Sequence, residues 1–320
     1  MSRPHRETAQ VAMSDRGRAI GLAAIVLVAS FLTIWMFTKG RAALAEQTSA
    51  PILDRIEPSR FSANPWSLPD DAMLGFIEIP AGTFLMGSDP AIDPAAYENE
   101  RWSATERRGE IDLPRYFIGR YEVTIAQFAA FVADTHRKVD AQALRGHGDR
   151  PVTNVTWADA IAYARWLEQR LRTSPQTPAT LKSLLESGWR IMLPSEAQWE
   201  KAARGADGRI YPWGSVPDPE KANFGRSGTT PVGSFECADC AFGLADMSGN
   251  VWELTRSFFQ PYPWTPDETP RDLHAPALFV MRGGSYSDGP NNVRAAVRGG
   301  IDPGARRAFI GFRLVLELPP

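Results

Sequence analysis

Residues 243–255 read GLADMSGNVWELT and place two carboxylates, Asp246 and Glu253, among apolar side chains. Charged side chains are rarely buried without a partner. This segment therefore needs a counter-charge, which either a bound cation or an ion pair can supply. The chain from Gly205 to Pro276 carries few periodic runs, so we expect irregular structure there that packed aromatic side chains or a cation must hold in place.

Three helices are predicted upstream of this segment by one N-terminal signal. A Ser or Thr precedes an apolar run, and Gln or Asp follows three residues later, which is the pattern of a capping box. The pairs are Thr124 with Gln127, Thr156 with Asp159, and Ser195 with Gln198. Strands are expected within residues 115–123, 278–287, 293–299 and 309–317, with two short strands around a turn in residues 76–88 and a long surface loop at 89–114.

The first forty residues differ from the rest of the chain. Residues Ala19–Phe37 carry no charge and are long enough to cross a bilayer as a helix. Four arginines precede this run and two basic residues follow it, which favours a cytoplasmic N-terminus and a periplasmic C-terminal part at a bacterial inner membrane. The alternative is a signal peptide cleaved after Ala43-Leu44-Ala45. We divide the chain into a cytoplasmic N-terminus (1–18), an anchor (19–38), a linker (39–72) and a globular domain (73–320).

The composition excludes some classes of function. A net charge of −2 over 320 residues gives no reason to expect a nucleic-acid partner. The two cysteines, Cys237 and Cys240, form a C-x-x-C pair that is compatible with a zinc site, a redox pair or a small disulfide. We favour the disulfide, because no further soft ligands lie nearby and the periplasm is oxidising.

Eight phrases occur in one order along the globular part: IPAGTFLMGS, RYEVTIAQFAAFV, PVTNVTWADAIAYARWLEQRL, MLPSEAQWEKAARG, YPWG, GLADMSGNVWE, MRGGSYSD and GFRLV. In this order they resemble the formylglycine-generating enzyme, or sulfatase-modifying-factor, superfamily over residues 76–316. The resemblance implies an α+β domain with a modified C-type-lectin-like fold, much irregular structure and bound calcium.

By position, the resemblance also assigns calcium ligands. Asp246 and Glu253 would supply carboxylate oxygens, and Gly249 and Val251 would supply backbone carbonyls, which are the hard ligands that Ca²⁺ prefers. Without the resemblance, the preferred explanation is that Asp246 caps a turn and Glu253 forms a surface ion pair; with it, we favour Ca²⁺. A second family site would use Asn223 and the carbonyl of Phe224, but the acidic residue that should follow them is missing.

Enzymes of the family that make formylglycine bind copper through two cysteines soon after the RGGS phrase. Here no cysteine follows Gly283, and Asp288 stands near the first of those positions. Oxygen ligands do not replace two thiolates for Cu(I), so we expect no copper and no copper-dependent formylglycine synthesis. A related branch uses iron on three histidines, but His5, His136, His147 and His274 show no such spacing.

The remaining prediction is a surface that binds a substrate peptide or partner protein. The residues that the resemblance places there are Ser285, Tyr286, Asp288, Asn291, Asn292, Arg294 and Arg298. The two arginines would bind a carboxylate, although such side chains also form internal ion pairs. We therefore expect a membrane-anchored periplasmic accessory or maturation protein. The alternatives are a periplasmic enzyme that acts on a peptide or peptide-derived product and a single-pass structural subunit of a membrane complex.

Overall fold

The computed structural model describes residues 61, 63–103, 105–235, 237–265 and 277–319. The chain separates into one unit at residues 1–51 and a second at 52–320. The predicted N-terminus 1–18 and anchor 19–38, with almost all of the linker up to residue 62, lie outside the described residues. Within the part that is described, no helix combines the length and the apolarity needed to span a membrane.

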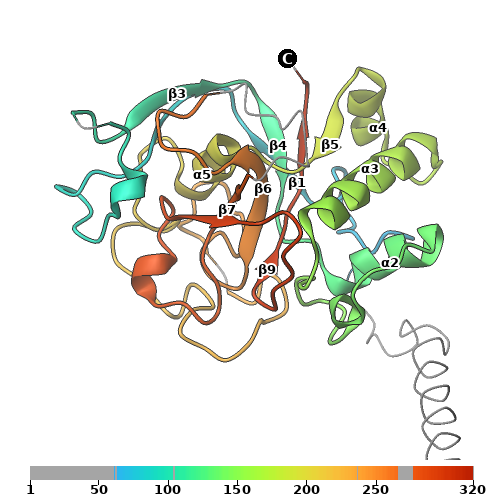
Figure 1. Cartoon of the computed structure of the whole chain (residues 1–320). Coiled ribbons are helices and arrows are strands. Elements are labelled where there is room, and N and C mark those ends of the chain that lie inside the picture. The colour runs from blue at the N-terminus through green and yellow to red at the C-terminus, as the bar shows by residue number, and fades with distance from the viewer. Residues whose placement is uncertain (1–60, 62, 104, 236, 266–276, 320) are drawn as a thin grey trace, which may run out of the picture. The chain divides into compact units, whose positions relative to one another are not determined.

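The described residues of the domain form three sheets and four α-helices (Figure 1). The first sheet has the order β1 (Phe76–Ile79), β4 (Tyr116–Gly119), β10 (Val315–Glu317), β5 (Arg190–Met192). The second pairs β2 (Gly82–Met86) with β3 (Gly109–Leu113), and the third has the order β8 (Arg298–Ile301), β7 (Phe279–Arg282), β6 (Trp252–Phe258), β9 (Ile310–Gly311). The helices are α2 (Ile125–Thr135), α3 (Trp157–Thr173), α4 (Ala179–Glu186) and α5 (Glu196–Arg204), and short 3-10 turns lie at Glu98–Glu100, Ala141–Leu144 and Pro290–Asn292.

All three predicted capping boxes are confirmed. The side chains of Thr124, Thr156 and Ser195 each accept a hydrogen bond from the backbone N–H three residues later, and each third residue returns one. Helix α5 ends before Gly205, its C-cap residue, which has φ at 70°. Helix α4 escaped sequence analysis because Pro178 precedes it and no side chain caps it.

Removing one of these caps gives a local test of the fold. Thr156 accepts a hydrogen bond from the Asp159 backbone N–H at 3.1 Å, and its hydroxyl donates to the Asp159 carboxylate at 2.7 Å. Thr156→Ala should therefore destabilise the protein by about 1–2 kcal/mol in urea unfolding. Thr173→Ala, at the exposed other end of α3, should change stability by less than about 0.5 kcal/mol. Equal effects of the two substitutions would contradict the role of the cap.

The strands differ from the sequence prediction in their pairing. β1 and β2 do not pair with each other, because β1 pairs with β4 and β2 pairs with β3. β3 lies inside the segment predicted as a surface loop, and β8 begins only at Arg298. The run 309–317 divides into β9 in the third sheet and β10 in the first. This division places Arg313, between the two strands, in the interior.

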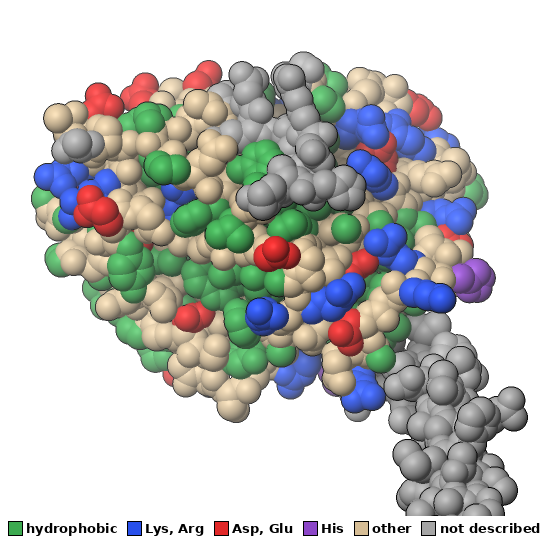
Figure 2. All heavy atoms as spheres, viewed as in Figure 1, with side chains coloured by type: hydrophobic (Ala, Val, Ile, Leu, Met, Phe, Trp, Pro, Cys, Tyr) green, Lys and Arg blue, Asp and Glu red, His purple; other side chains and the backbone are tan. Residues whose placement is uncertain are grey.

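The larger core cluster lies where α2, α3 and α4 pack, on the right in Figure 1. Phe128, Phe131, Tyr163 and Trp166 form a group of ring contacts there, with centroids 5.4–6.1 Å apart. Lys and Arg side chains gather on the outside of this helical part (Figure 2). Trp66 and Leu68 are buried in the same cluster, so the packed domain begins before Met73 and the predicted boundary is several residues too late.

Candidate functional site

The segment 243–255 leads into β6 and carries Glu253 to the centre of the domain. Both oxygens of this buried carboxylate accept hydrogen bonds from Arg313, at 2.6 Å each. Trp199 Nε1 donates to the same carboxylate at 2.7 Å. Glu253 therefore has its counter-charge in an arginine and does not fit the calcium-ligand role that the resemblance gave it. The ion-pair explanation was the correct one for this residue.

Asp246 lies in a different environment from Glu253. Its backbone is left-handed, with φ at 56°, and Oδ2 accepts a 2.6 Å hydrogen bond from Gly233 N. Oδ1 is buried without a hydrogen-bond partner, as is Oε2 of Glu122. Burial raises the pKa of Asp246 to about 6. Burial, followed by the charge of Asp246, raises the pKa of Glu122 well above its ordinary value.

Two asparagines connect this carboxyl pair to the ANFG turn. Asn250 donates to Glu122 Oε1 at 3.0 Å and accepts from Asn223 Nδ2 at 3.0 Å. Asn223 is fully buried and its Oδ1 has no partner. Gly249 lies so close to Asn223 that a Cβ at 249 would be 2.3 Å from the Asn223 carbonyl oxygen. Glu122, Asn250 and Asn223 thus form one hydrogen-bonded chain, and Asp246 lies close enough for its charge to act on Glu122. We call these four side chains, Glu122, Asn223, Asp246 and Asn250, the oxygen cluster.

The oxygen cluster has part of the chemistry that a calcium ion requires. Glu122, Asp246 and Asn223 each present a buried oxygen that receives no hydrogen bond, and such oxygens are hard ligands. Among the described residues, no three or more His, Cys, Asp or Glu side chains come close enough to hold a metal ion together. A cation here would therefore depend on amide and backbone carbonyl oxygens besides the two carboxylates. Glu122 was missed by sequence analysis, since an acidic residue before a capped helix carries no metal-ligand signal.

The loop after the RGGS phrase is organised around Asp288. Its Oδ2 accepts hydrogen bonds from Ser285 N at 2.9 Å, Ser285 Oγ at 2.7 Å and Trp252 Nε1 at 2.9 Å. Its Oδ1 accepts from Asn292 Nδ2 at 3.2 Å. Asp288 therefore builds the turn itself, at the position where the resemblance places a copper thiolate.

The two arginines predicted to bind a substrate carboxylate are committed to internal ion pairs. Arg294 contacts Asp93 at 2.5 Å and Glu100 at 2.7 Å. Arg298 pairs with Glu196 through two hydrogen bonds of 2.6 and 2.7 Å. Both arginines are buried, so neither is available to a ligand, and this part of the groove prediction is wrong.

These pairs belong to a larger buried arrangement, the arginine–carboxylate lattice. Its members are Asp93, Glu100, Glu196, Glu200, Arg204, Arg282, Arg294 and Arg298, all buried. Arg282 contacts Glu196 at 3.2 Å and also pairs with Glu200, which Arg204 contacts at 2.8 Å. Four arginines balance four carboxylates, so Arg282, Arg294 and Arg298 stabilise the interior.

What remains exposed around the 285–292 loop is aromatic and amide-rich. Tyr97 donates to Asn292 Oδ1 at 2.7 Å, and Tyr211 donates to the Pro290 carbonyl at 3.1 Å. The rings of Tyr211 and Trp213 stack at 5.5 Å with 15° between their planes. We call this region the aromatic surface; it comprises Ile92, Tyr97, Trp213 and residues 286–292, and the buried ring of Tyr211 supports it by stacking on Trp213. It retains Tyr286, Asn291 and Asn292 of the predicted groove in accessible positions, whereas Ser285 is buried.

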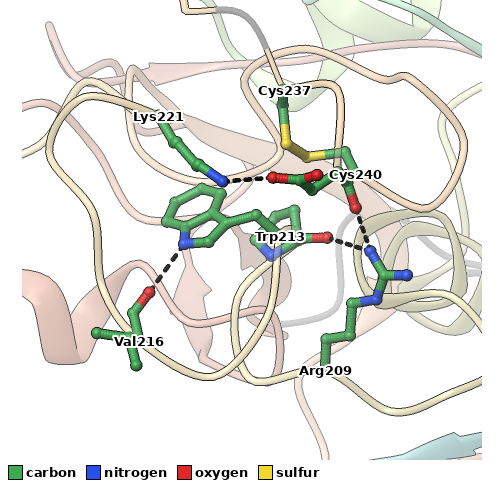
Figure 3. The surroundings of a disulfide bond; sticks show 8 residues. Arg209, Trp213, Val216, Lys221, Cys237 and Cys240 are labelled. Atoms are coloured by element: carbon green, nitrogen blue, oxygen red, sulfur yellow. Dashed lines mark hydrogen bonds and ion pairs between the residues drawn. A yellow bond between two sulfur atoms is a disulfide. The ribbon is translucent and has the colours of Figure 1, made fainter.

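A disulfide between Cys237 and Cys240 borders this surface (Figure 3), with a Cα–Cα distance of 5.3 Å. Arg209 donates to the Pro212 carbonyl at 3.0 Å and to the Asp239 carbonyl, while Lys221 contacts the Asp239 carboxylate at 2.6 Å. Trp213 Nε1 donates to the Val216 carbonyl at 2.8 Å. The cysteines are thus structural, and the loop they close is tied to the segment that carries Trp213.

A family model described as a sulfatase-modifying factor enzyme 1-like domain matches residues 65–318. This chain belongs to that family. Sulfatase-modifying factor relatives include the formylglycine-generating enzyme of Thermomonospora curvata, 28% identical over 78% of this chain and 95% of that protein. The inactive Cα-formylglycine-generating enzyme 2 of Mus musculus is 30% identical over 74% of this chain and 84% of the mouse protein.

A hercynine oxygenase of Mycolicibacterium smegmatis is 30% identical over 75% of this chain, and the chain spans only 60% of that protein's length. Among solved structures, PvdO from Pseudomonas aeruginosa is 24% identical to this chain, with a TM-score of 0.61. The superposition covers 76% of this chain and 94% of the PvdO chain. That likeness shows the fold alone. Together with the family match, it establishes the α+β sulfatase-modifying-factor fold with its irregular segments.

Proposed function

We propose that this chain is a membrane-anchored periplasmic accessory or maturation protein whose sulfatase-modifying-factor domain binds a partner protein or peptide without copper-dependent formylglycine chemistry. The observation that carries the proposal is the loop around Asp288, where a carboxylate accepting four hydrogen bonds stands in place of a thiolate. The only two cysteines of the chain are bonded to each other elsewhere. A relative described as inactive, in mouse, supports non-catalytic use of the same domain.

The aromatic surface is the proposed place of binding. Aromatic side chains supply large contact area at low cost in conformational entropy. Ile92 and Tyr97 are 52% and 43% exposed, while Asn291 and Asn292 offer amide groups to a peptide backbone. The uncharged run 19–37 supports an anchor in a bacterial inner membrane, with the N-terminus in the cytoplasm.

Site-specific photo-crosslinking in membranes tests this proposal. A benzophenone amino acid at Tyr286, in the full chain expressed in bacteria, should give one discrete adduct. The same group at Ser183, exposed on α4, should give none. The purified chain, supplied with copper and a cysteine-containing peptide, should form no aldehyde. Aldehyde formation, or identical adducts from both positions, would overturn the proposal.

We also propose that the domain binds one structural Ca²⁺ at the oxygen cluster, and that Glu122 takes the role expected of Glu253. Asp246 and Glu122 would supply the carboxylates, Asn223 an amide oxygen, and Gly249 and Val251 their carbonyls. Two adjacent buried carboxyl groups repel each other when both are ionised. A divalent cation offsets that repulsion and would join the ANFG turn to the segment 243–255.

Calcium should therefore stabilise the folded chain. At a free concentration a hundred times the dissociation constant, one site contributes about 2.7 kcal/mol, which scanning calorimetry detects as a rise of several degrees in Tm. Asp246→Asn and Glu122→Gln should each abolish this rise. Asp140→Asn, whose carboxylate makes a solvent-exposed hydrogen bond to Gln142 N outside the oxygen cluster, should leave it unchanged. An equal calcium response in all of these proteins would contradict the site.

The same site predicts a dependence on pH. The carboxyl of Asp246 ionises near pH 4 in the unfolded chain and near pH 6 in the folded one. The folded state therefore binds more protons in this window, and the chelator-treated protein should lose stability as pH rises from about 4 to about 6. Urea unfolding across this range, with and without Ca²⁺, measures the effect; a stability that rises with pH in chelator would contradict it.

A further inference from the structure

The helical part of the domain carries an excess of positive charge. Residues 125–190, which contain α2, α3 and α4, hold nine Lys and Arg residues but only six Asp and Glu residues, although the whole chain has a net charge of −2. All nine basic side chains are at least partly exposed, and Figure 2 shows Lys and Arg gathered on this part. Arg150 donates to Thr229, outside the helical part. We call the other eight the basic face: Arg137, Lys138, Arg145, Arg165, Arg170, Arg172, Lys182 and Arg190.

Several cations of the basic face have their acidic partners buried beneath them. The buried Asp159 carboxylate pairs with Arg137 at 3.0 Å. The buried Glu168 carboxylate pairs with Arg172 at 3.1 Å and with Arg190 at 2.8 Å. The three arginine side chains are themselves 32–53% exposed. These pairs therefore present guanidinium groups to the outside, while their carboxylates are covered.

Four other cations make no ion pair among the described residues: Lys138, Arg145, Arg165 and Lys182. Only three carboxylates of the helical part reach the surface. They are Asp134, which pairs with Arg170, together with Asp140 and Glu186. Eight cations thus face outward with three anions. Six of the eight are arginines, whose planar fork donates two parallel hydrogen bonds to a phosphate.

The chain enters the packed domain at this same part. Trp66 is buried in the core cluster that α2, α3 and α4 build, and Gln127 on α2 donates to the Ser67 carbonyl at 3.0 Å. About 25 residues separate the predicted anchor from this point, and a flexible chain of that length spans about 25–30 Å. A bilayer that holds the anchor is therefore the polyanionic surface nearest to the basic face.

We propose that the basic face docks on the phosphate groups of anionic phospholipids in the membrane that holds the anchor. The inference rests on the membrane anchor of the proposed function. Each Lys or Arg close to an anionic bilayer favours the docked state by about fivefold, so several together outweigh the freedom of a tethered domain. The aromatic surface shares no residue with the basic face, so docking leaves it free for a partner.

Headgroup quenching with the full chain in vesicles tests the docking. Gln169→Cys, exposed on α3 between Arg165 and Arg172, carries a thiol-reactive fluorophore, since the native cysteines are bonded to each other. The vesicles contain phosphatidylcholine with a nitroxide headgroup, alone or with about one-third phosphatidylglycerol. Phosphatidylglycerol should increase quenching, and about 0.5 M NaCl should reverse the increase. A fluorophore at Val216→Cys, 68% exposed beside Trp213, should show no increase.

A pair of substitutions, each made in the Gln169→Cys chain, tests the charge itself. Arg165→Gln should lower the ratio of docked to free domain by about fivefold, without removing an ion pair that holds the fold. Arg107→Gln is the matched control, an exposed arginine that also makes no ion pair among the described residues. It lies in the segment before β3, on the left in Figure 1 and away from α3, and should leave the ratio unchanged.

Extraction with alkaline carbonate separates failure of the docking from failure of the anchor. A chain that resists extraction from phosphatidylcholine vesicles, yet shows equal quenching with and without phosphatidylglycerol, overturns the docking and keeps the anchor. An equal effect of Arg165→Gln and Arg107→Gln also overturns it. A chain that is extracted, but floats with phosphatidylglycerol vesicles at low salt alone, removes the anchor and supports the basic face.

Discussion

Glu253→Ala should destabilise the domain by about 3–5 kcal/mol, because it leaves the Arg313 guanidinium buried without its counter-charge. Glu253 and Arg313 are both completely buried, and two hydrogen bonds of 2.6 Å join them. The substitution also leaves Trp199 Nε1 without its acceptor. Urea unfolding followed by circular dichroism measures the loss; for a domain of marginal stability, this is a large part of the total.

Glu78→Ala is the matched control for this prediction. Glu78 is 51% exposed and lies 3.9 Å from Arg115, so its removal should change stability by less than about 1 kcal/mol. A double replacement, Glu253→Leu with Arg313→Met, should recover much of the loss, since an apolar pair leaves no unpaired charge. A loss below about 1 kcal/mol in Glu253→Ala would mean that the pair does not form as described.

Gly249→Ala should cost at least about 3 kcal/mol, because two penalties act together. Gly249 has φ at 80°, a region that L-residues rarely adopt, and its added Cβ would meet the Asn223 carbonyl oxygen at 2.3 Å. The two backbones lie so close that relief requires the ANFG turn to move, which would also separate the oxygens of the proposed calcium site. We therefore expect the calcium-dependent rise in Tm to disappear in this variant.

Gly225→Ala isolates the backbone penalty. Gly225 also has a positive φ, 64°, but nothing lies within 4 Å of a Cβ built there. Its substitution should cost only about 1 kcal/mol and should preserve the response to calcium. If the two glycine variants unfold at the same urea concentration, the close approach at residue 249 is not a structural requirement.

The local features of this fold could be predicted from sequence, and the non-local ones could not. The capping boxes at Thr124, Thr156 and Ser195 depend on residues three positions apart, so the chain itself displays them. The pairing of β2 with β3 joins residues 82–86 to the far end of the long polar stretch that follows them, which lacks a period. A strand of five residues within such a stretch gives no signal that distinguishes it from a loop.

The candidate site divides in the same way. Asp246 was recognisable as a carboxylate in an apolar segment, but Glu122 lies 124 residues earlier and became relevant only through folding. Arg294 and Arg298 were assigned to the groove because the resemblance places the chain after the RGGS phrase beside the substrate peptide. Their partners Asp93, Glu100 and Glu196 lie about one hundred to two hundred residues away in the sequence. Only the structure therefore distinguishes an arginine in an internal ion pair from one that is free to bind a ligand.

The position of β10 within the first sheet constrains the order in which the protein can be made. β10 is an inner strand, flanked by β4 and β5, although it comes last of the ten strands in the described residues. During synthesis, β4 and β5 must therefore wait with unpaired edges until residues 315–317 emerge. Ribosomal stalling or truncation before that point should yield a product that proteases and chaperones recognise, even though the nine preceding strands of the described residues have already been made.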